Sequence, residues 1–179
     1  MTTSDLETRI RAAVRDVPDF PKPGIVFKDI TPVLGDASLF RQLTERMAQP
    51  FANDRVSHVV AIESRGFILG GPIAIRLAAG LVPVRKPGKL PSRRERVEYA
   101  LEYGMDILEV HADALSPKSR VLVVDDVLAT GGTALATLSL IRRLGAEVVG
   151  LSFMIELRFL SPTPTPRLDC FEGTLPCRP

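Results

Sequence analysis

The stretch VLVVDDVLATGGT, residues 121–133, combines a buried strand, two carboxylates and a glycine turn. Four apolar residues lead directly to Asp125 and Asp126, and a Thr-Gly-Gly-Thr turn then precedes a helical pattern. A strand that ends in a tight loop before a helix is typical of an α/β protein. The loop suits a phosphate, because glycines let backbone N–H groups approach it and a helix N-terminus favours negative charge. The two carboxylates can bind sugar hydroxyls or a metal ion, so the stretch indicates a site for a phosphorylated ribose.

Other phosphate-binding motifs and several protein classes do not match the sequence. The chain contains neither Gly-Lys-Ser/Thr nor Gly-x-Gly-x-x-Gly, which excludes a Walker loop and a dinucleotide fingerprint. Its 179 residues, 45% of them apolar, predict a single globular domain over residues 1–179. A net charge of +2 is too small to indicate nucleic-acid binding. Without an apolar run of about 18 residues or a signal-peptide core, we expect no membrane span and a cytoplasmic location.

Strand and helix patterns alternate from residue 56 to residue 157. We expect strands at 56–62, 81–84, 121–127 and 147–157, and helices at 4–14, 38–51, 70–79 and 133–144. This order predicts an α/β fold with a mostly parallel central sheet flanked by helices. In such sheets, ligands bind at the carboxyl ends of the strands. The pair Asp125 and Asp126 and the run ESRG at 63–66 fall at such ends, so we expect them to share one solvent-facing crevice.

A basic segment interrupts this alternation at about residues 85–104. It is rich in lysine and arginine, contains prolines and a glycine, and continues into a hairpin pattern that turns near Gly104. Its position directly after a strand end favours a mobile lid over an anionic site. A solvated basic loop is the alternative interpretation.

Several segments together resemble the type I phosphoribosyltransferases, and within them the adenine phosphoribosyltransferases. The matching segments are FPKPGIVFKDITP (20–32), IESRGF (62–67), RKPGKLP (85–91), LEYG (101–104) and VVDDVLATGGT (123–133). The resemblance extends over about residues 5–157. The last motif is shared by the whole superfamily, whereas the segments near Gly24 and at 101–104 narrow the resemblance to enzymes that act on adenine.

The resemblance implies a fold and a reaction. The fold would be the type I phosphoribosyltransferase fold with a basic lid hairpin. The enzyme would be a pentosyltransferase of purine salvage that converts adenine and 5-phosphoribosyl 1-diphosphate (PRPP) to AMP and diphosphate. The cofactor would be Mg²⁺, held mainly by diphosphate, ribose hydroxyls and water, as this ion prefers. Because family members are homodimers, we expect a homodimer here.

The resemblance also assigns residues to the three parts of the substrates. The 5-phosphate would be bound by Ala129, Thr130, Gly131, Gly132 and Thr133. The diphosphate would be bound by a loop of Ser64, Arg65 and Gly66 and by Arg85, Lys86 and Lys89. Adenine would be bound by Val26, Phe27 and Lys28, with the Phe27 ring stacked on the base. The peptide bond between Glu63 and Ser64 is expected to be cis, as it often is in the family.

Four residues would carry catalysis: Asp125, Asp126, Glu102 and Tyr103. The two aspartates would engage the ribose hydroxyls and stabilise the positive charge that develops at C1 in the transition state. Glu102 would handle the adenine proton near N7, and Tyr103 would help the lid to exclude water. Strand alternation places these two side chains on opposite faces, unless Gly104 distorts the turn.

Two other functions stay open, and the C-terminus departs from the pattern. A lysine such as Lys28 would suit a 6-oxo base, xanthine or hypoxanthine, in the same chemistry. A non-catalytic regulator would use the fold to sense PRPP, but such proteins usually carry a DNA-binding domain, and only about 20 residues precede the first matching segment.

The tail at 158–179 is atypical, and its proline-rich run 161–166 is expected to lie outside the sheet interior.

Overall fold

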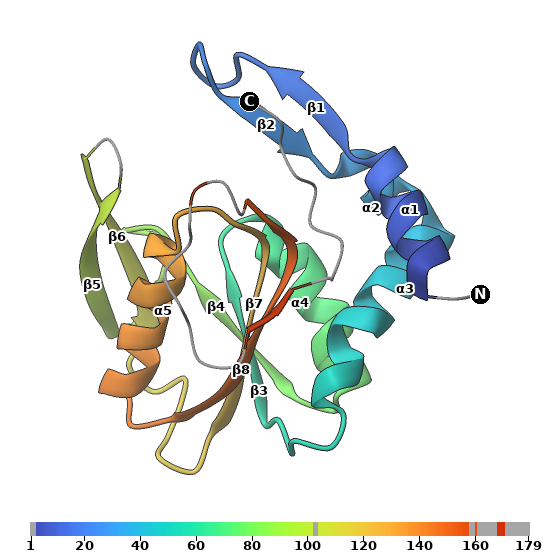
Figure 1. Ribbon diagram of the computed structural model, residues 1–179. Coiled ribbons are helices and arrows are strands. Elements are labelled where there is room, and N and C mark those ends of the chain that lie inside the picture. The colour runs from blue at the N-terminus through green and yellow to red at the C-terminus, as the bar shows by residue number, and fades with distance from the viewer. Residues whose placement is uncertain (1–2, 102–103, 158–159, 161–167, 171–179) are drawn as a thin grey trace. The chain divides into compact units, whose positions relative to one another are not determined.

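The computed structural model describes residues 3–101, 104–157, 160 and 168–170. These residues form two compact units, divided between Arg46 and Met47. Each unit has its own helices and strands (Figure 1). The single domain expected over residues 1–179 stays a prediction.

The first unit contains a two-stranded ribbon. Its elements are α1 (Thr3–Ala13), β1 (Arg15–Pro18), β2 (Val26–Asp29), α2 (Thr31–Gly35) and α3 (Ala37–Ala48), which crosses the division. Strands β1 and β2 pair antiparallel, with Val17 opposite Phe27. In the turn between them Gly24 has φ +85° and donates its N–H to Asp19 Oδ1 at 2.8 Å. The local sequence pattern does not predict this ribbon, because prolines and glycines indicate only a turn there.

The second unit is built on a parallel sheet. Its elements in chain order are η1 (Gln49–Phe51), β3 (His58–Ile62), α4 (Arg65–Arg76), β4 (Gly80–Val84), β5 (Arg94–Leu101), β6 (Gly104–His111), β7 (Arg120–Leu128), α5 (Gly132–Arg143), β8 (Glu147–Glu156) and β9 (Leu168–Cys170). The strand order in the five-stranded sheet is β4-β3-β7-β8-β9, and every neighbouring pair is parallel. The predicted α/β fold with a mostly parallel sheet is confirmed.

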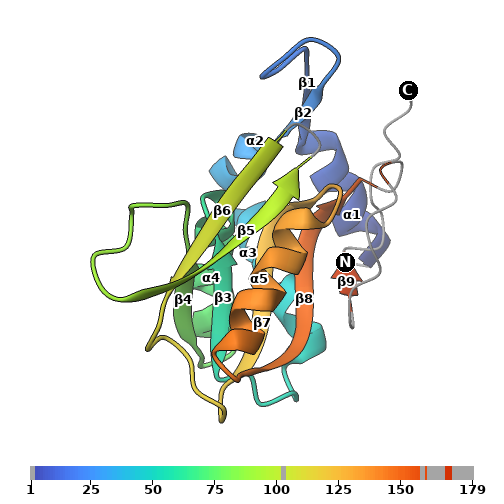
Figure 2. The ribbon, with the colours of Figure 1, turned by 90° about the vertical axis from the view of Figure 1, so that its left-hand side faces the viewer.

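Helices α4 and α5 cover opposite faces of this sheet (Figures 1 and 2). Helix α4 connects β3 to β4 on one side of the sheet order, and α5 connects β7 to β8 on the other side. Both connections are expected to be right-handed crossovers, and they run toward opposite edges of the sheet. Two such crossovers from neighbouring strands place their helices on opposite faces of the sheet. The sheet order therefore changes direction between β3 and β7, and ligands bind beside such a switch point.

Strand β7 lies in the middle of the core of this unit. Its residues Val121, Leu122, Val123 and Val124 are all fully buried. Because helices cover both faces of the sheet, side chains on both sides of the strand avoid water, and the strand is a continuous apolar run rather than an alternating one. The same apolar cluster includes side chains of β3, β4, β6, α5 and β8.

Helix α4 begins at Arg65, earlier than the expected start at residue 70. Gly66, Gly70 and Gly71 argue against a helix by local propensity. Gly70, however, lies so close to β3 that a Cβ atom on it would be 2.7 Å from the Cβ of Ala61. Close helix–sheet packing needs glycine at this position and overrides the propensity.

Strands β5 and β6 form the expected hairpin after the basic segment. They pair antiparallel, with Leu101 opposite Gly104, so the chain turns where the sequence predicts. The hairpin lies against α5, where Arg143 donates to the Arg96 carbonyl at 2.9 Å (Figure 2). Helix α5 thus holds the hairpin beside the sheet.

Strand β9 extends the edge of the sheet beside β8. The proline-rich run 161–166 lies outside the described residues, so the expectation for it stays a prediction. Within the described parts of the chain, no helix is long and apolar enough to cross a membrane.

Candidate active site

A turn with a left-handed glycine joins β7 to α5. Gly131 has φ +86°, and α5 begins at the next residue, Gly132. The first hydrogen bond of the helix runs from Leu135 N to Gly131 O and is 2.9 Å long. The backbone N–H groups that precede it in the first turn have no partner within the helix. A hollow of about 140 Å³ lies at this turn, lined by Asp125, Phe153 and all residues from 127 to 134. The five residues predicted for the 5-phosphate therefore line one hollow together with a catalytic candidate.

The two carboxylates at the end of β7 differ in their surroundings. Asp125 lines the hollow, whereas Asp126 is only 4% exposed. Asp126 Oδ2 lies 2.7 Å from Arg65 Nε, and the Asp126 N–H donates to Asp125 Oδ1 at 2.9 Å. The expectation that both carboxylates face solvent is wrong for Asp126, because alternation along the strand turns its side chain toward α4.

Burial raises the pKa of both carboxyl groups. For Asp125, burial is the main cause and the charge of Asp126 adds to it. For Asp126, burial outweighs the Arg65 guanidinium, which acts in the opposite direction. Neighbouring carboxylates resist joint ionisation. A cation or a set of hydroxyl donors beside Asp125 would relieve this repulsion, so the pair is suited to a sugar or a metal ion.

The N-terminus of α4 lies at the same strand end. Ser64 is its N-cap residue and Arg65 its first helical residue, so the predicted loop 64–66 is in fact the start of a helix. The Glu63–Ser64 peptide is cis, as expected. A Cβ atom on Gly66 would lie 2.9 Å from Asp125 Oδ1 and 3.0 Å from Val124 O, so glycine is required where α4 meets β7. A helix N-terminus carrying an arginine suits an anion.

These features coincide with those of a known family. The phosphoribosyl transferase domain matches residues 36–158. The adenine phosphoribosyltransferase of Myxococcus xanthus is 58% identical over 160 residues, which are 89% of this chain and 87% of that protein. The chain belongs to the adenine phosphoribosyltransferases.

Crystal structures of other adenine phosphoribosyltransferases have the same fold. The Rhodothermus marinus protein is 50% identical with a TM-score of 0.89, over 94% of this chain and 98% of that one. The Saccharomyces cerevisiae protein, crystallised with adenine and an imino-altritol bisphosphate, is 33% identical with a TM-score of 0.88, over 94% and 99% of the two chains. The resemblance and the fold predicted from the sequence are thereby confirmed.

The basic residues predicted for the diphosphate gather around one carboxylate that the sequence interpretation did not assign, Glu63. Arg85 Nε lies 3.3 Å from Glu63 Oε2, Lys89 Nζ contacts Glu63 Oε1, and the Lys86 N–H donates to Glu63 Oε2 at 3.0 Å. Burial acts to raise the pKa of Glu63, but Lys89, the Lys86 N–H and Arg85 outweigh it and lower the pKa. Glu63 is therefore ionised and engages groups that a diphosphate would also bind.

A second set of contacts reaches from the basic segment to the phosphate loop. Lys86 Nζ lies 3.1 Å from Asp106 Oδ2, and the Tyr99 hydroxyl lies 3.4 Å from the same oxygen and 3.2 Å from Thr133 Oγ1. Sequence reasoning assigned no role to Tyr99 or Asp106, and no local signal marks them. Glu63, in contrast, lies within the matched segment 62–67, and this position marks it as a candidate site residue.

The residues predicted to bind adenine belong to the first unit. Val26 is exposed, and the ring of Phe27 packs edge-to-face on Phe20, with 5.2 Å between the ring centroids. Lys28 Nζ lies 2.5 Å from Asp16 Oδ1 of the neighbouring strand. The roles of Val26, Phe27 and Lys28 toward adenine stay predictions.

The remaining catalytic candidates, Glu102 and Tyr103, lie outside the described residues. Their neighbours in the hairpin, Leu101 and Gly104, are paired across β5 and β6. The predicted proton transfer by Glu102 and the predicted lid contact of Tyr103 therefore stay predictions.

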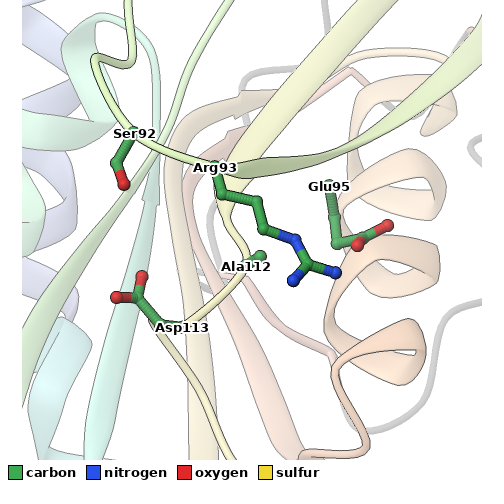
Figure 3. Close-up of a pocket in the computed structure, with 5 residues that line it drawn as sticks. All are labelled: Ser92, Arg93, Glu95, Ala112 and Asp113. Atoms are coloured by element: carbon green, nitrogen blue, oxygen red, sulfur yellow. The ribbon is translucent and has the colours of Figure 1, made fainter.

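A second hollow lies at the other end of the hairpin. It has a volume of about 270 Å³ and is lined by Ser92, Arg93, Glu95, Ala112 and Asp113 (Figure 3). Its lining mixes one arginine with two carboxylates and includes no helix N-terminus. The chemistry of a phosphate site is therefore found at the α5 turn and not here.

Proposed function

We propose that this chain transfers, in the cytoplasm, the 5-phosphoribosyl group of PRPP to N9 of adenine, with AMP and diphosphate as products, as a step of purine salvage. The observation that carries the proposal is the hollow at residues 127–134, which Asp125 also lines, at the sheet end where α4 and α5 both begin. The adenine phosphoribosyltransferases that are 50–59% identical to the chain support adenine as the base.

The reaction breaks one bond at C1 of the ribose and forms another. The C1–O bond breaks with its electron pair leaving on the diphosphate, while a nitrogen lone pair of adenine forms the C1–N bond. Positive charge grows on the sugar between these events. Asp125, on the wall of the hollow, would stabilise this charge more in the transition state than in the ground state. The ion pair with Arg65 would let Asp126 hold α4 in position.

The leaving diphosphate would be received by residues 64–66 at the N-terminus of α4 and by Arg85, Lys86 and Lys89. Two features of the second unit support this assignment. Helix N-termini bind anions through unpaired N–H groups. The Glu63 carboxylate already holds Arg85 and Lys89 together at the end of β3. An incoming diphosphate would therefore only have to replace this carboxylate as their partner, and the cations would not have to be brought together from separate places.

A magnesium ion fits the donors of this site. The carboxylate of Asp125, on the wall of the hollow, is the ligand type that Mg²⁺ prefers. Within the described residues, no group of three or more His, Cys, Asp or Glu side chains could hold a metal ion. We therefore propose that diphosphate, ribose hydroxyls and water supply most of the ligands. The bound ion would neutralise charge on the leaving diphosphate.

Adenine would be bound by Val26, Phe27 and Lys28 and deprotonated with the help of Glu102. A proton must leave the base as its ring nitrogen becomes glycosidic, and a carboxylate is a suitable acceptor. Tyr103 would help to exclude water from the reacting sugar. The exposed Val26 and the aromatic pair of Phe27 and Phe20 support an apolar slot in this segment.

A turnover assay with a panel of bases tests the proposed function. The protein is incubated with PRPP and Mg²⁺ and with adenine, hypoxanthine or xanthine, and nucleotide and diphosphate are quantified. We expect turnover with adenine and little with the 6-oxo bases, and the engagement of Lys28 by Asp16 supports this order. Faster turnover of a 6-oxo base would reassign the substrate, and PRPP binding without turnover of any base would indicate a regulator.

We also propose a homodimer that forms on the outer face of α4. Ile75 is 84% exposed, and Ile68 lies on the same helix face, seven residues earlier. Leu81 on the neighbouring strand β4 is exposed too. Large exposed apolar side chains gathered on neighbouring elements are typical of protein–protein interfaces.

Light scattering of a charged variant tests this interface. We expect twice the 19.5 kDa chain mass for the wild type at micromolar concentration and a shift toward the single chain for Ile75→Glu. Leu135→Glu is the matched control, because Leu135 is an exposed leucine on α5. A wild-type mass of one chain, or an equal effect of both variants, would contradict the proposed interface.

A further inference from the structure

A continuous series of polar side chains connects the phosphate loop with the start of the basic segment, at Lys86. Thr133 Oγ1 lies 3.2 Å from the Tyr99 hydroxyl, which lies 3.4 Å from Asp106 Oδ2. The same Asp106 oxygen lies 3.1 Å from Lys86 Nζ. The two ends, Thr133 and Lys86, are the residues proposed for the 5-phosphate and for the diphosphate. The two middle residues have no role so far.

The backbone holds these middle residues in place. Tyr99 and Asp106 face each other across the β5–β6 hairpin as register partners. The Tyr99 ring packs against the apolar core of the second unit, so its hydroxyl is carried at a defined position. Asp106 Oδ1 accepts the Ile107 N–H at 2.8 Å, which leaves Oδ2 for the side chains of Tyr99 and Lys86.

The charges of these groups decide which atom donates. Burial is the main cause that raises the pKa of the Tyr99 hydroxyl, so the hydroxyl keeps its proton. Burial acts to raise the pKa of Asp106 as well, but the Ile107 N–H and Lys86 outweigh it and lower the pKa. An ionised carboxylate only accepts hydrogen bonds. Tyr99 therefore donates to Asp106, and its oxygen is free to accept the proton of Thr133.

We propose that Tyr99 is a positioning residue of the PRPP site, which orients Thr133 toward the 5-phosphate and, through Asp106, Lys86 toward the diphosphate. This inference rests on the proposed function. A hydroxyl has one proton, so Thr133 cannot donate to Tyr99 and to a phosphate at once. When the 5-phosphate accepts the Thr133 proton, Tyr99 can donate to Thr133 Oγ1 instead, and its hydrogen bond to Asp106, and with it the position of Lys86, then changes. The 5-phosphate and the diphosphate of PRPP are then bound by one connected set of hydrogen-bonded groups, and the two ends do not contribute independently to PRPP affinity.

The variant Tyr99→Phe tests the proposal, because it removes the hydroxyl and keeps the ring that packs in the core. We expect KM for PRPP to rise roughly two- to tenfold, which corresponds to one hydrogen bond. KM for adenine and kcat should stay within about twofold, since Tyr99 touches no reacting atom in this scheme. Thr137→Val is the matched control. It removes a hydroxyl one turn further along α5 that donates to the Thr133 carbonyl rather than to its side chain, and KM for PRPP should not change.

A double-mutant cycle with Lys86→Met separates positioning from a merely structural role. If the two ends of PRPP are bound by one coupled set of groups, Tyr99→Phe raises KM for PRPP by less than about 1.5-fold in the Lys86→Met background, against roughly two- to tenfold in the wild type. Equal effects in both backgrounds would overturn the proposal. So would an unchanged KM for PRPP in Tyr99→Phe, or an equal rise of KM for both substrates.

Two further measurements keep the test decisive. Asp106→Asn weakens the same series of hydrogen bonds at Asp106 and replaces Tyr99→Phe as the test if that variant fails to fold. It should show the same selective rise in KM for PRPP, and an unchanged KM would overturn the proposal. Calorimetric titration with PRPP repeats the comparison without chemistry. Weaker PRPP binding in Tyr99→Phe would support the inference even if the wild type turned over none of the bases, which would refute the proposed function alone.

Discussion

Replacing Gly66 with alanine perturbs the contact between α4 and β7 by one methyl group. The added Cβ would lie 2.9 Å from Asp125 Oδ1 and 3.0 Å from Val124 O, against an ordinary contact of 3.4 Å or more. The carboxylate can rotate away, but the Val124 carbonyl is backbone, so the helix and the strand end must separate by about 0.4 Å (3.4 − 3.0). Overpacking of this kind typically costs about 1–3 kcal/mol. Gly66 lies in the first turn, where the better helix propensity of alanine offsets little of that cost.

Activity should respond more strongly to Gly66→Ala than stability does. The shift displaces Asp125 relative to the hollow, and misplacement of a catalytic group can cost on the order of 10²-fold in rate. We therefore expect the free energy of unfolding in urea to fall by about 1–2 kcal/mol, with an unchanged slope against denaturant. In the same preparation, kcat/KM for PRPP should fall on the order of 100-fold.

Gly35→Ala is the control for this prediction. Gly35 is also helical, but a Cβ on it would meet no atom within 4 Å. Its free energy of unfolding should change by less than about 0.5 kcal/mol, and its kcat/KM should be that of the wild type. An unfolding free energy of Gly66→Ala at or above the wild-type value, together with kcat/KM within threefold, would refute the steric reasoning.

Three further predictions concern the carboxylates, the helix–sheet contact and the proton transfer. Asp125→Asn should lower turnover on the order of 100-fold, because the negative charge beside the reacting sugar is lost. Asp126→Asn should also lower turnover on the order of 100-fold, because the ion pair that positions α4 beside Asp125 is weakened. Because the pKa of Asp125 is raised in the folded state, its ionised form destabilises the fold, and Asp125→Asn should have a higher melting temperature than the wild type at neutral pH. The difference in melting temperature should shrink as the pH falls through the raised pKa. A lower melting temperature of Asp125→Asn at neutral pH would contradict this reasoning. Gly70→Ala should destabilise the protein by about 1–3 kcal/mol, and Ala61→Gly in the same chain should restore part of the loss in urea titrations, because the two Cβ positions are 2.7 Å apart; additive losses would argue against the contact. Glu102→Leu should lower kcat on the order of 10²–10⁴-fold with little change in PRPP affinity, and a loss below threefold would show that the proton leaves by another route.

Much of the fold follows from local patterns in the sequence. The apolar run at 121–124, the carboxylates and the glycine turn predict strand, strand end and helix start, because each depends on neighbours in the chain. The alternation of strands and helices then predicts a parallel sheet with ligands at its carboxyl edge. The predicted start of α4 at residue 70 is wrong, because Gly66 and Gly70 are needed for contacts with β7 and β3, and local helix propensity does not include such contacts.

The sequence determined on its own which residues form the phosphate loop, and where the two aspartates stand, since strand, turn and helix start are adjacent in the chain. Only the tertiary structure decided that Asp126 is buried against Arg65, that Glu63 gathers Arg85 and Lys89, and that Tyr99 reaches Thr133. Each of these contacts joins separate elements of the second unit. They depend on sheet order, strand register and helix packing, and those are set by burial of the whole core rather than by neighbours along the chain.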